Sequence, residues 1–267
     1  MLSNLDKDGI FLKILFDGYD FINSEVGSIL VPKSIHQKII DTTFVNQLYD
    51  QADIFIDYCY QKYLLSGLQP YVNDYLMSKH KIGLYSIADS LDCNNPWKDK
   101  NFILFNSNQL TVVNEKINLM DIKFWVCPSY DKDGKCDGIG FRILDTKMVR
   151  DAFKWIFMSG NNIIYGKDSV DLNKDCYIVE GFRDYIALKE LGYNVIGLGS
   201  VFISDIQKEF ISKLKNPIIL LDSDSFGLKQ TVNLQNQYRV AIMTGETKKD
   251  AWETFSAGLP IKIVEVK

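Results

Sequence analysis

The sequence has few of the residues that bind structural zinc. It contains five cysteines, none in a C-x-x-C pair, and two histidines. A zinc ribbon or finger requires closely spaced pairs of cysteine or histidine ligands, so we expect no zinc site. The odd number and wide spacing of the cysteines favour reduced thiols that are mostly buried as small apolar groups.

Long apolar runs are also missing. No stretch approaches the ~18 consecutive apolar residues of a membrane-spanning helix. Residues 1–16 are interrupted by Asp6, Lys7 and Asp8, and they lack the cleavage pattern of a signal peptide. The sequence therefore predicts a cytoplasmic protein that does not bind membranes. Glycine and proline are scarce, at 17 and 6 residues, and 46% of the residues are hydrophobic, which excludes disordered and collagen-like proteins.

An excess of positive charge is missing as well. The net charge is −4 and the isoelectric point is near 5.3. These values argue against a protein that coats nucleic acid with a broad basic surface. They are compatible with a protein whose acidic residues hold metal ions. A chain of 267 residues is long enough for one large domain or two compact ones.

The pattern after residue 171 is regular. Apolar segments there alternate between strand-like and helix-like spacing. The predicted strands are 176–180, 195–198, 217–221, 238–243 and 261–266, and the predicted helices are 182–191, one that begins at Ser204, 228–236 and 250–257. Such alternation is typical of a parallel sheet covered by helices, so we predict an α/β domain at 171–267.

The preceding residues have a less regular pattern. It predicts helices at 50–65 and 70–78, short strands at 102–105, 111–113 and 124–126, and a hairpin whose turn is 130–135 and whose second strand contains 138–143. We interpret 46–170 as an α+β domain. Residues 1–45 are an amino-terminal extension whose sequence indicates no role.

Acidic residues gather where the predicted strands of the α/β domain end. They are Glu180, Asp184, Asp222, Asp224 and Asp250, with Glu253 one turn further on. The carboxyl ends of parallel strands meet at one edge of a sheet, where such folds bind ligands. Crowded carboxylates repel one another unless a hard cation such as Mg²⁺ or Mn²⁺ lies between them. Each acid alone is more typical of a solvated loop or a helix N-terminus; their order together predicts phosphoryl or nucleotidyl transfer.

The motifs of this region resemble a Toprim domain, which bacterial-type DNA primases, topoisomerases and some nucleases share. The matching residues are Ile178-Val179-Glu180-Gly181-Phe182-Arg183-Asp184, Gly197-Leu198-Gly199 and Leu220-Leu221-Asp222-Ser223-Asp224. The resemblance implies that Glu180 is a general acid or base and a metal ligand. It also implies that Asp184, Asp222 and Asp224 bind Mg²⁺ or Mn²⁺.

A later primase motif is matched only in part. Lys249-Asp250 followed by Gly258 resembles it, which implies that Asp250 binds metal. Trp252 stands where the family has a second acid. Whether Glu253 replaces that acid is left open by the sequence.

The residues before the Toprim region resemble the RNA-polymerase core of bacterial and phage primases. The matching series is Tyr130-Asp131 to Gly134, Gly140-Phe141-Arg142, Ile156-Phe157 and Ile164-Tyr165-Gly166. The resemblance implies that Arg142 and Lys147 face the nucleotide and the template, although both would also be ordinary surface residues beside a hairpin. Ser159 stands where the family has a second lysine, and Lys154 or Lys167 would compensate.

These observations lead to three hypotheses. The first is a phage-type DNA primase that joins ribonucleoside triphosphates into short primers on a single-stranded DNA template. The second is a metal-dependent Toprim nuclease, and the third is a non-catalytic Toprim module that binds DNA or a replication protein. The chain shows no zinc-domain pattern and no helicase nucleotide-binding loop. A primase of this kind is therefore expected to work with a replicative helicase or with a zinc-domain protein in trans.

Overall fold

The computed structural model describes the backbone at 19–24 and 27–32, and residues 51–86, 88–89, 92–96, 122–144, 154–158, 162–200, 203–220, 237–244 and 250–266 in full. The chain divides into two compact units. Unit 1 comprises Met1–Val126 and Phe141–Met158, and unit 2 comprises Cys127–Gly140 and Ser159–Lys267. Within the described residues, no helix combines the length and apolar character that crossing a membrane requires. The domain limits after residues 45 and 170 stay predictions.

Unit 2 is built on a five-stranded sheet with the order β11-β10-β9-β7-β8. The strands are β7 (Asp175–Val179), β8 (Val195–Gly197), β9 (Asn216–Leu220), β10 (Arg239–Thr244) and β11 (Lys262–Val266). β7 pairs in parallel with β8 and β9, and β10 pairs in parallel with β9, as predicted. β11, at one end of the strand order, is antiparallel to β10. An antiparallel neighbour needs no crossover to the far end of the sheet, so the short helix between these strands suffices.

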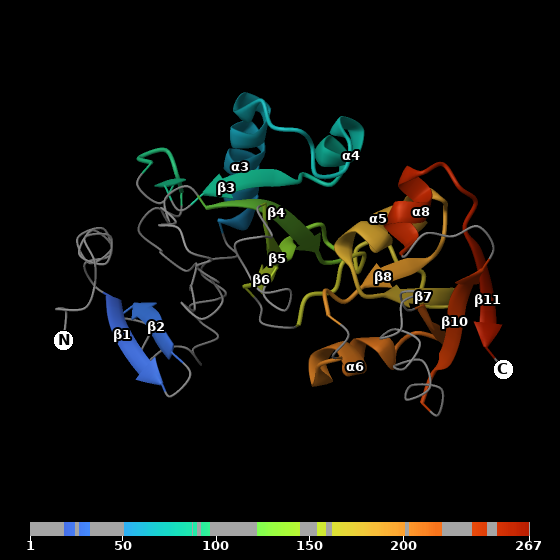
Figure 1. Ribbon diagram of the computed structural model, residues 1–267. Helices are drawn as coiled ribbons and strands as arrows, with labels where there is room; N and C mark the ends of the chain where they lie inside the picture. Colours follow the sequence, from blue (N-terminus) through green and yellow to red (C-terminus); the bar gives the residue numbers. More distant parts are fainter. Residues whose placement is uncertain are drawn as a thin grey trace. The chain divides into compact units, whose positions relative to one another are not determined.

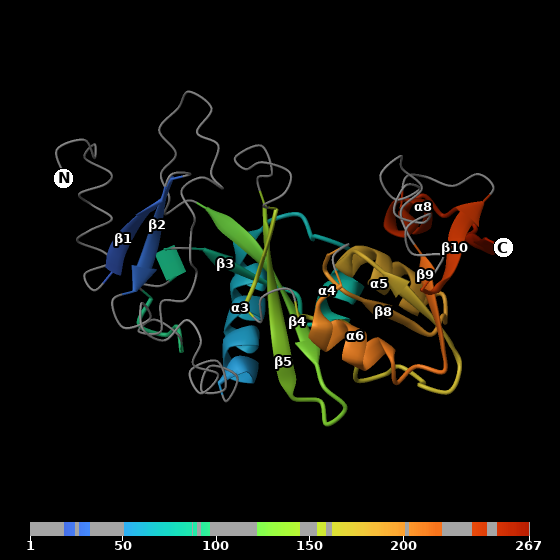
Figure 2. The same ribbon diagram turned by 90° about the horizontal axis from the view of Figure 1, so that it is seen from below.

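Helices lie on both faces of this sheet. α5 (Phe182–Glu190) and α8 (Ala251–Ser256) lie on one face, and α6 (Asp205–Ile211) lies on the other (Figures 1 and 2). α6 begins with a capping box, in which the Ser204 side chain and the Gln207 side chain bond each other's backbone N–H groups. The three helices confirm the predictions at these positions. The predicted helix 228–236 lies outside the described residues.

A continuous apolar cluster holds β7 at the centre of the sheet. Cys176 and Ile178 of β7 are buried in it, together with Ile196 of β8, Ile219 of β9 and Ile211 of α6. Each such aliphatic side chain contributes about 1.5–3 kcal/mol when it is fully removed from water. The carboxyl end of β7, where the predicted site begins, is therefore supported by a packed core.

Unit 1 contains most of a four-stranded sheet with the order β3-β4-β5-β6. The strands are β3 (Gly83–Ser86), β4 (Lys123–Tyr130), β5 (Cys136–Ile143) and β6 (Trp155–Phe157); β4 and β5 continue into unit 2. The hairpin of β4 and β5 confirms the prediction around 130–143. The sequence pattern did not predict β3 and β6, which are only 4 and 3 residues long.

The helices of unit 1 are α3 (Ala52–Ser66) and α4 (Asp74–Lys79). α3 confirms the prediction at 50–65. The prediction at 70–78 was too long, because the Asn73 side chain accepts a hydrogen bond from the Leu76 N–H at 2.9 Å and so caps a helix that begins only at Asp74.

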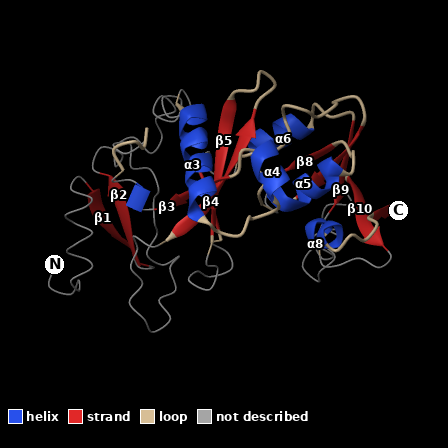
Figure 3. Cartoon of the chain, turned by 90° about the horizontal axis from the view of Figure 1, so that it is seen from above, coloured by secondary structure: helices blue, strands red, loops and turns tan. Residues whose placement is uncertain are grey.

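One side of α3 packs against the sheet (Figure 3). The Phe55 ring lies 5.3 Å from the Tyr85 ring and 6.4 Å from the Phe141 ring. At Gly83 the backbones approach so closely that a Cβ would lie 2.5 Å from Cys59 Cβ. Ahead of α3, β1 (Tyr19–Ser24) and β2 (Gly27–Pro32) form an antiparallel pair. The strands predicted at 102–105 and 111–113 lie outside the described residues.

Candidate active site

Glu180 directly follows β7 and is half-buried. Its position is fixed from the neighbouring strand, because the Gly199 N–H donates to the Glu180 carbonyl at 2.8 Å and the Leu198 N–H donates to the Val179 carbonyl at 3.0 Å. The structure therefore places Glu180 at the carboxyl end of the central strand of a parallel group. This is the position that the sequence pattern predicted for it.

Asp184 lies in the first turn of α5 and points back toward the end of β7. A Cβ at position 181 would collide with Oδ2 of Asp184, so Gly181 provides the space that this carboxylate occupies. Oδ1 of Asp184 accepts a hydrogen bond from the Trp252 N–H of α8 at 3.0 Å. Asp184 is thus held between the start of α5 and the start of α8.

Three residues of the predicted motifs, Asp184, Asp250 and Trp252, meet at the start of α8. Asp250 is the N-cap of this helix, and its Oδ1 accepts a hydrogen bond from the Glu253 N–H at 2.7 Å. The Trp252 side chain packs beneath the Arg183 guanidinium, whose Cζ lies 5.7 Å from the ring centre. Glu253 is exposed. Asp184 and Asp250 therefore bind backbone N–H groups of the same helical turn, while Trp252 links that turn to α5.

Asp222, Asp224 and Lys147 lie outside the described residues. β9, which leads toward Asp222, is paired with β7 so that Ile219 faces Ile178. The two strands run in the same direction and end at the same edge of the sheet. In the part of the chain that the structure describes, no group of three or more metal-ligating side chains is found.

Arg142 and Lys154 lie on adjacent strands of unit 1. Arg142 is a half-buried residue of β5, and its Cζ lies 5.5 Å from the centre of the Trp155 ring of β6. Lys154 precedes β6, and its carbonyl accepts a hydrogen bond from the Ile143 N–H at 3.1 Å. This backbone bond sets the register that brings Arg142 beside the aromatic side chains of β6.

Lys167 is held by the hairpin. Its ammonium group forms an ion pair with Oδ2 of Asp137 on β5. Ser129 Oγ on β4 lies 3.2 Å from the other oxygen of the same carboxylate. The sequence motifs did not indicate this role for Asp137, because the acid and the lysine are 30 residues apart.

The cysteines behave as the sequence predicted. Four are buried, Cys93 is exposed, and all five are free thiols. Burial raises the pKa of Cys176 on β7 to about 12, which favours the neutral thiol. Burial, reinforced by the negative charge of Asp168, also raises the pKa of Tyr185 on α5.

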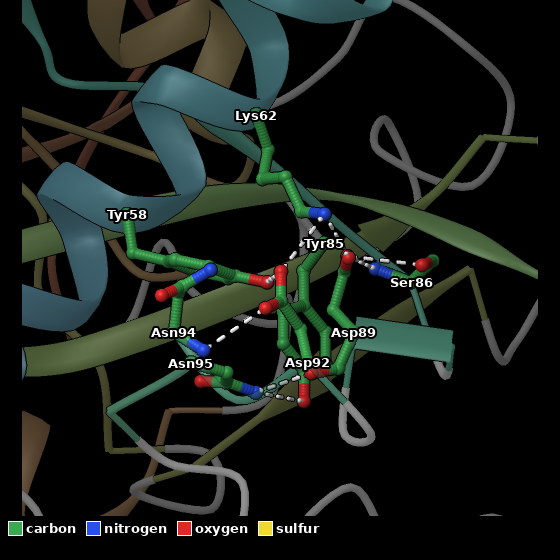
Figure 4. A network of polar contacts seen from close by, with 8 residues as sticks. All are labelled: Tyr58, Lys62, Tyr85, Ser86, Asp89, Asp92, Asn94 and Asn95. Atoms are coloured by element: carbon green, nitrogen blue, oxygen red, sulfur yellow. Dashed lines mark hydrogen bonds and ion pairs between the residues drawn. The ribbon is translucent and has the colours of Figure 1, made fainter.

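A second acidic cluster lies in unit 1 and is bonded in a different way (Figure 4). Lys62 of α3 lies 2.8 Å from Oδ1 of Asp89 and 3.3 Å from Oδ2 of Asp92. Oδ2 of Asp89 also accepts hydrogen bonds from the Ser86 N–H at 2.6 Å and from its hydroxyl at 2.9 Å. Asp92 accepts a bond from the Tyr58 hydroxyl at 2.9 Å. We call this group of five residues the Lys62 network.

The ionisation of the Lys62 network follows from these bonds. The hydrogen bond to Asp89 raises the pKa of Lys62, which keeps the lysine charged. The pKa of Asp92 is lowered, first by the backbone N–H of Asn94 and then by the Tyr58 hydroxyl. Burial and the bond to Asp92 raise the pKa of Tyr58. The network joins α3 to the residues after β3 through one ammonium group that both carboxylates contact.

Comparison with known families supports the assignment of the second unit. Residues 177–255 match the Toprim-like family. This segment contains Glu180, Asp184 and Asp250, and it ends within α8. Residues 177–255 form a Toprim-like domain. No curated protein has significant sequence similarity to the whole chain.

About four fifths of the chain resembles solved primase catalytic domains in fold. One similar structure is the DnaG primase catalytic domain bound to single-stranded DNA, which is 15% identical with a TM-score of 0.51, and the match covers 81% of this chain and 76% of that chain. The RNA polymerase domain of Mycobacterium tuberculosis primase DnaG, in complex with double-stranded DNA, is 17% identical with a TM-score of 0.56, at 80% and 76% coverage.

A third similar structure contains the zinc-binding and RNA polymerase domains of the Aquifex aeolicus primase. It is 17% identical with a TM-score of 0.56, and the match covers 82% of this chain and 60% of that chain. The Toprim-like domain and the residues before it thus have the fold of a primase catalytic core. This confirms the predicted fold class, an α/β Toprim domain preceded by an α+β subdomain.

Sequence reasoning did not find two features near the predicted residues. One is the hydrogen bond that the Trp252 N–H donates to Asp184. It was not found because no side-chain pattern records a backbone donor. The other is the parallel stacking of Trp155 and Phe157, whose rings lie 5.6 Å apart at an interplanar angle of 7°. Their spacing of two residues on a strand was the available signal, since it puts both rings on one face.

Proposed function

We propose that the protein is a DNA primase that makes short RNA primers on a single-stranded DNA template by metal-dependent nucleotidyl transfer. The observation that carries the proposal is the position of Glu180 and Asp184. Both lie at the carboxyl end of β7 in a Toprim-like domain, within the fold of a primase catalytic core. That the primase is of the phage type stays a prediction from the sequence.

The donor atoms of the site fit Mg²⁺ or Mn²⁺. Carboxylate oxygens are the preferred ligands of these hard cations, and Asp184 and Asp250 are both oriented by backbone N–H groups. A backbone N–H orients a carboxylate without neutralising it. Glu180, Asp184, Asp222, Asp224 and Asp250 would hold the ion. When bound, it would lower the charge repulsion between the attacking 3′-hydroxyl and the triphosphate.

The residues of the chain would perform the remaining steps. Glu180 accepts the proton of the 3′-hydroxyl as its oxygen forms a bond to the α-phosphorus of the incoming nucleotide. The bond from that phosphorus to the pyrophosphate oxygen breaks, and pyrophosphate leaves. Arg142 and Lys147 hold the triphosphate and the template, with Lys154 and Lys167 as further cationic contacts. For Lys167 this requires exchange of its Asp137 partner for a phosphate oxygen.

The partners follow from the same proposal. The substrates are ribonucleoside triphosphates and single-stranded DNA. A replicative helicase, or a zinc-domain protein acting in trans, completes template selection and unwinding. The reaction takes place in the cytoplasm, that of the bacterial host for a phage-encoded enzyme.

The test is incubation of the protein with single-stranded DNA of varied sequence, labelled ribonucleoside triphosphates and Mg²⁺ or Mn²⁺. We expect short ribonucleotide products that disappear in Asp222→Ala. The matched control is Glu209→Gln, which changes an acid of α6 whose side chain is 72% exposed and paired with Lys213. Metal-dependent shortening of the DNA without ribonucleotide products would show a nuclease instead. Absence of both activities and of metal binding would indicate a non-catalytic binding module.

A further inference from the structure

Three side chains of unit 1 form a continuous stack. The Trp155 and Phe157 rings of β6 lie parallel, with centroids 5.6 Å apart and an interplanar angle of 7°. The guanidinium of Arg142 on the adjacent strand β5 lies over the Trp155 ring, with Cζ 5.5 Å from its centre. We call these three residues the Arg142 stack.

The Arg142 stack lies on the face of the sheet away from α3. Phe141 contacts Phe55 of α3, with ring centroids 6.4 Å apart. Successive side chains on a strand point to opposite faces, so Arg142 points away from that helix. Trp155 and Phe157 are two residues apart on β6 and share this second face. In the order of the described strands, β6 is at the end of the sheet.

Trp155 and Phe157 are partly exposed residues, and this distinguishes them from core aromatics. Trp125 of the same unit is only 6% exposed and is covered by the rings of Tyr63 and Tyr71. Flat apolar rings that remain in contact with water beside a cation offer a surface on which another planar group can stack.

We propose that the Arg142 stack binds unpaired bases of single-stranded DNA. Every base has a π-face that can extend a stack of parallel rings, so such a surface is tolerant of sequence. A guanidinium that packs its face on a ring presents its N–H groups at its edge, where a phosphate oxygen can accept them. Lys154, directly before Trp155, adds a second positive charge. Bases in a duplex are covered by their neighbours and are therefore excluded.

This inference rests on the proposed function for the choice of nucleic acid, but not on catalysis. Base stacking on an aromatic side chain contributes about 1–3 kcal/mol per base, and 1.4 kcal/mol is a tenfold change in Kd. We therefore expect Trp155→Ala to raise the Kd for a short single-stranded oligonucleotide by about tenfold or more. Trp155→Phe keeps a ring and should raise the Kd by less than about threefold.

The test measures binding of fluorescently labelled oligothymidylate by anisotropy, in EDTA and without nucleotides. A second probe of the same length is an abasic phosphodiester backbone. We expect Trp155→Ala and Phe157→Ala to weaken binding of oligothymidylate and to leave binding of the abasic probe unchanged. The matched control is Tyr75→Ala, which removes a ring that is 65% exposed and lies 5.5 Å from the Lys79 ammonium. It should affect neither probe.

Two results would overturn the proposal. One is unchanged binding of oligothymidylate by Trp155→Ala at an unchanged Tm, and the other is equal loss for both probes. If Trp155→Ala does not fold, Trp155→Phe decides the matter by tryptophan fluorescence, because the quenching caused by oligothymidylate should be lost while binding persists. Quenching that persists in Trp155→Phe would contradict the proposal that bases bind to the Arg142 stack. Because the binding assay contains no metal, a failure of primer synthesis would not change its result. A failure of base binding would likewise not change the result of the primer-synthesis assay.

Discussion

The two units of the protein hold their acidic side chains in different ways. In unit 1, Asp89 and Asp92 share the Lys62 ammonium, which offsets part of their negative charge. In unit 2, Asp184 and Asp250 accept hydrogen bonds from backbone N–H groups at the start of α8. The comparison teaches that acids paired with a lysine stabilise the fold. We propose that the acids at the strand end, which accept hydrogen bonds from backbone donors, bind a cation.

The largest expected effect tests the catalytic side of this comparison. Glu180→Gln keeps the size of the side chain but removes its charge and its ability to accept a proton. General acid–base groups contribute about 10²–10⁴-fold to rate, so primer synthesis should fall by at least about 100-fold. Circular dichroism should give an unchanged Tm. Retained synthesis would show that the chemistry lies elsewhere.

The next prediction tests whether the Lys62 network stabilises unit 1. Lys62→Ala leaves the buried Asp89, which is 7% exposed, without its cation. Because the Lys62 side chain is itself 35% exposed, this loss should cost about 1–3 kcal/mol in the free energy of unfolding, measurable by urea denaturation. The matched control is Lys81→Ala, whose ion pair with Asp57 is exposed, and it should change the free energy by less than about 1 kcal/mol. Equal effects of the two variants would contradict the assignment.

Substitutions at two glycines distinguish the effect of moving the Asp184 carboxylate from the effect of destabilising the fold. Gly181→Ala places a Cβ against Oδ2 of Asp184, so the carboxylate must move. We expect primer synthesis to fall by about tenfold with little change in Tm, because small displacements of reacting groups are costly. Gly192→Ala meets no atom within 4 Å but has φ +83° after α5. It should lower the free energy of unfolding by about 1 kcal/mol and leave specific activity unchanged.

The smallest effect concerns acid stability. Because the pKa of Asp92 is lowered in the folded state, its contribution to stability is present above the ordinary pKa of an aspartate side chain and is lost as the pH falls through that value and below it. Urea denaturation at several pH values between neutrality and acid measures this. Asp92→Asn should make stability less dependent on pH below that value. A steeper dependence in the variant would show that the sign is wrong.

Much of unit 2 could be predicted from the sequence because many of its features are local. Within the described residues, the alternation of strands and helices, the helix that begins at Ser204 and the position of Glu180 at the end of β7 are confirmed. The antiparallel direction of β11 could not be predicted, since pairing direction depends on the path of the connection and not on the strand's own residues. The hydrogen bond that the Trp252 N–H donates to Asp184 could not be predicted, because it joins residues 68 positions apart through a backbone atom.

Unit 1 was harder to predict because its short strands have little periodicity. β3 and β6 were missed, and α4 was predicted too long. The Lys62 network depends on bonds between α3 and a turn about 30 residues later, which no motif records. Arg142 was identified only through the resemblance to primases. Its contact with Trp155 requires the register of two adjacent strands.

The most direct test of the central claim is Mn²⁺ binding, measured by electron paramagnetic resonance for the wild type, Asp184→Asn and Asp92→Asn. Asparagine preserves the shape of each side chain and removes one negative charge. The account predicts that Asp184→Asn raises the Kd for Mn²⁺ by at least about tenfold and that Asp92→Asn leaves it unchanged. Unchanged binding in Asp184→Asn, or a loss confined to Asp92→Asn, would contradict it.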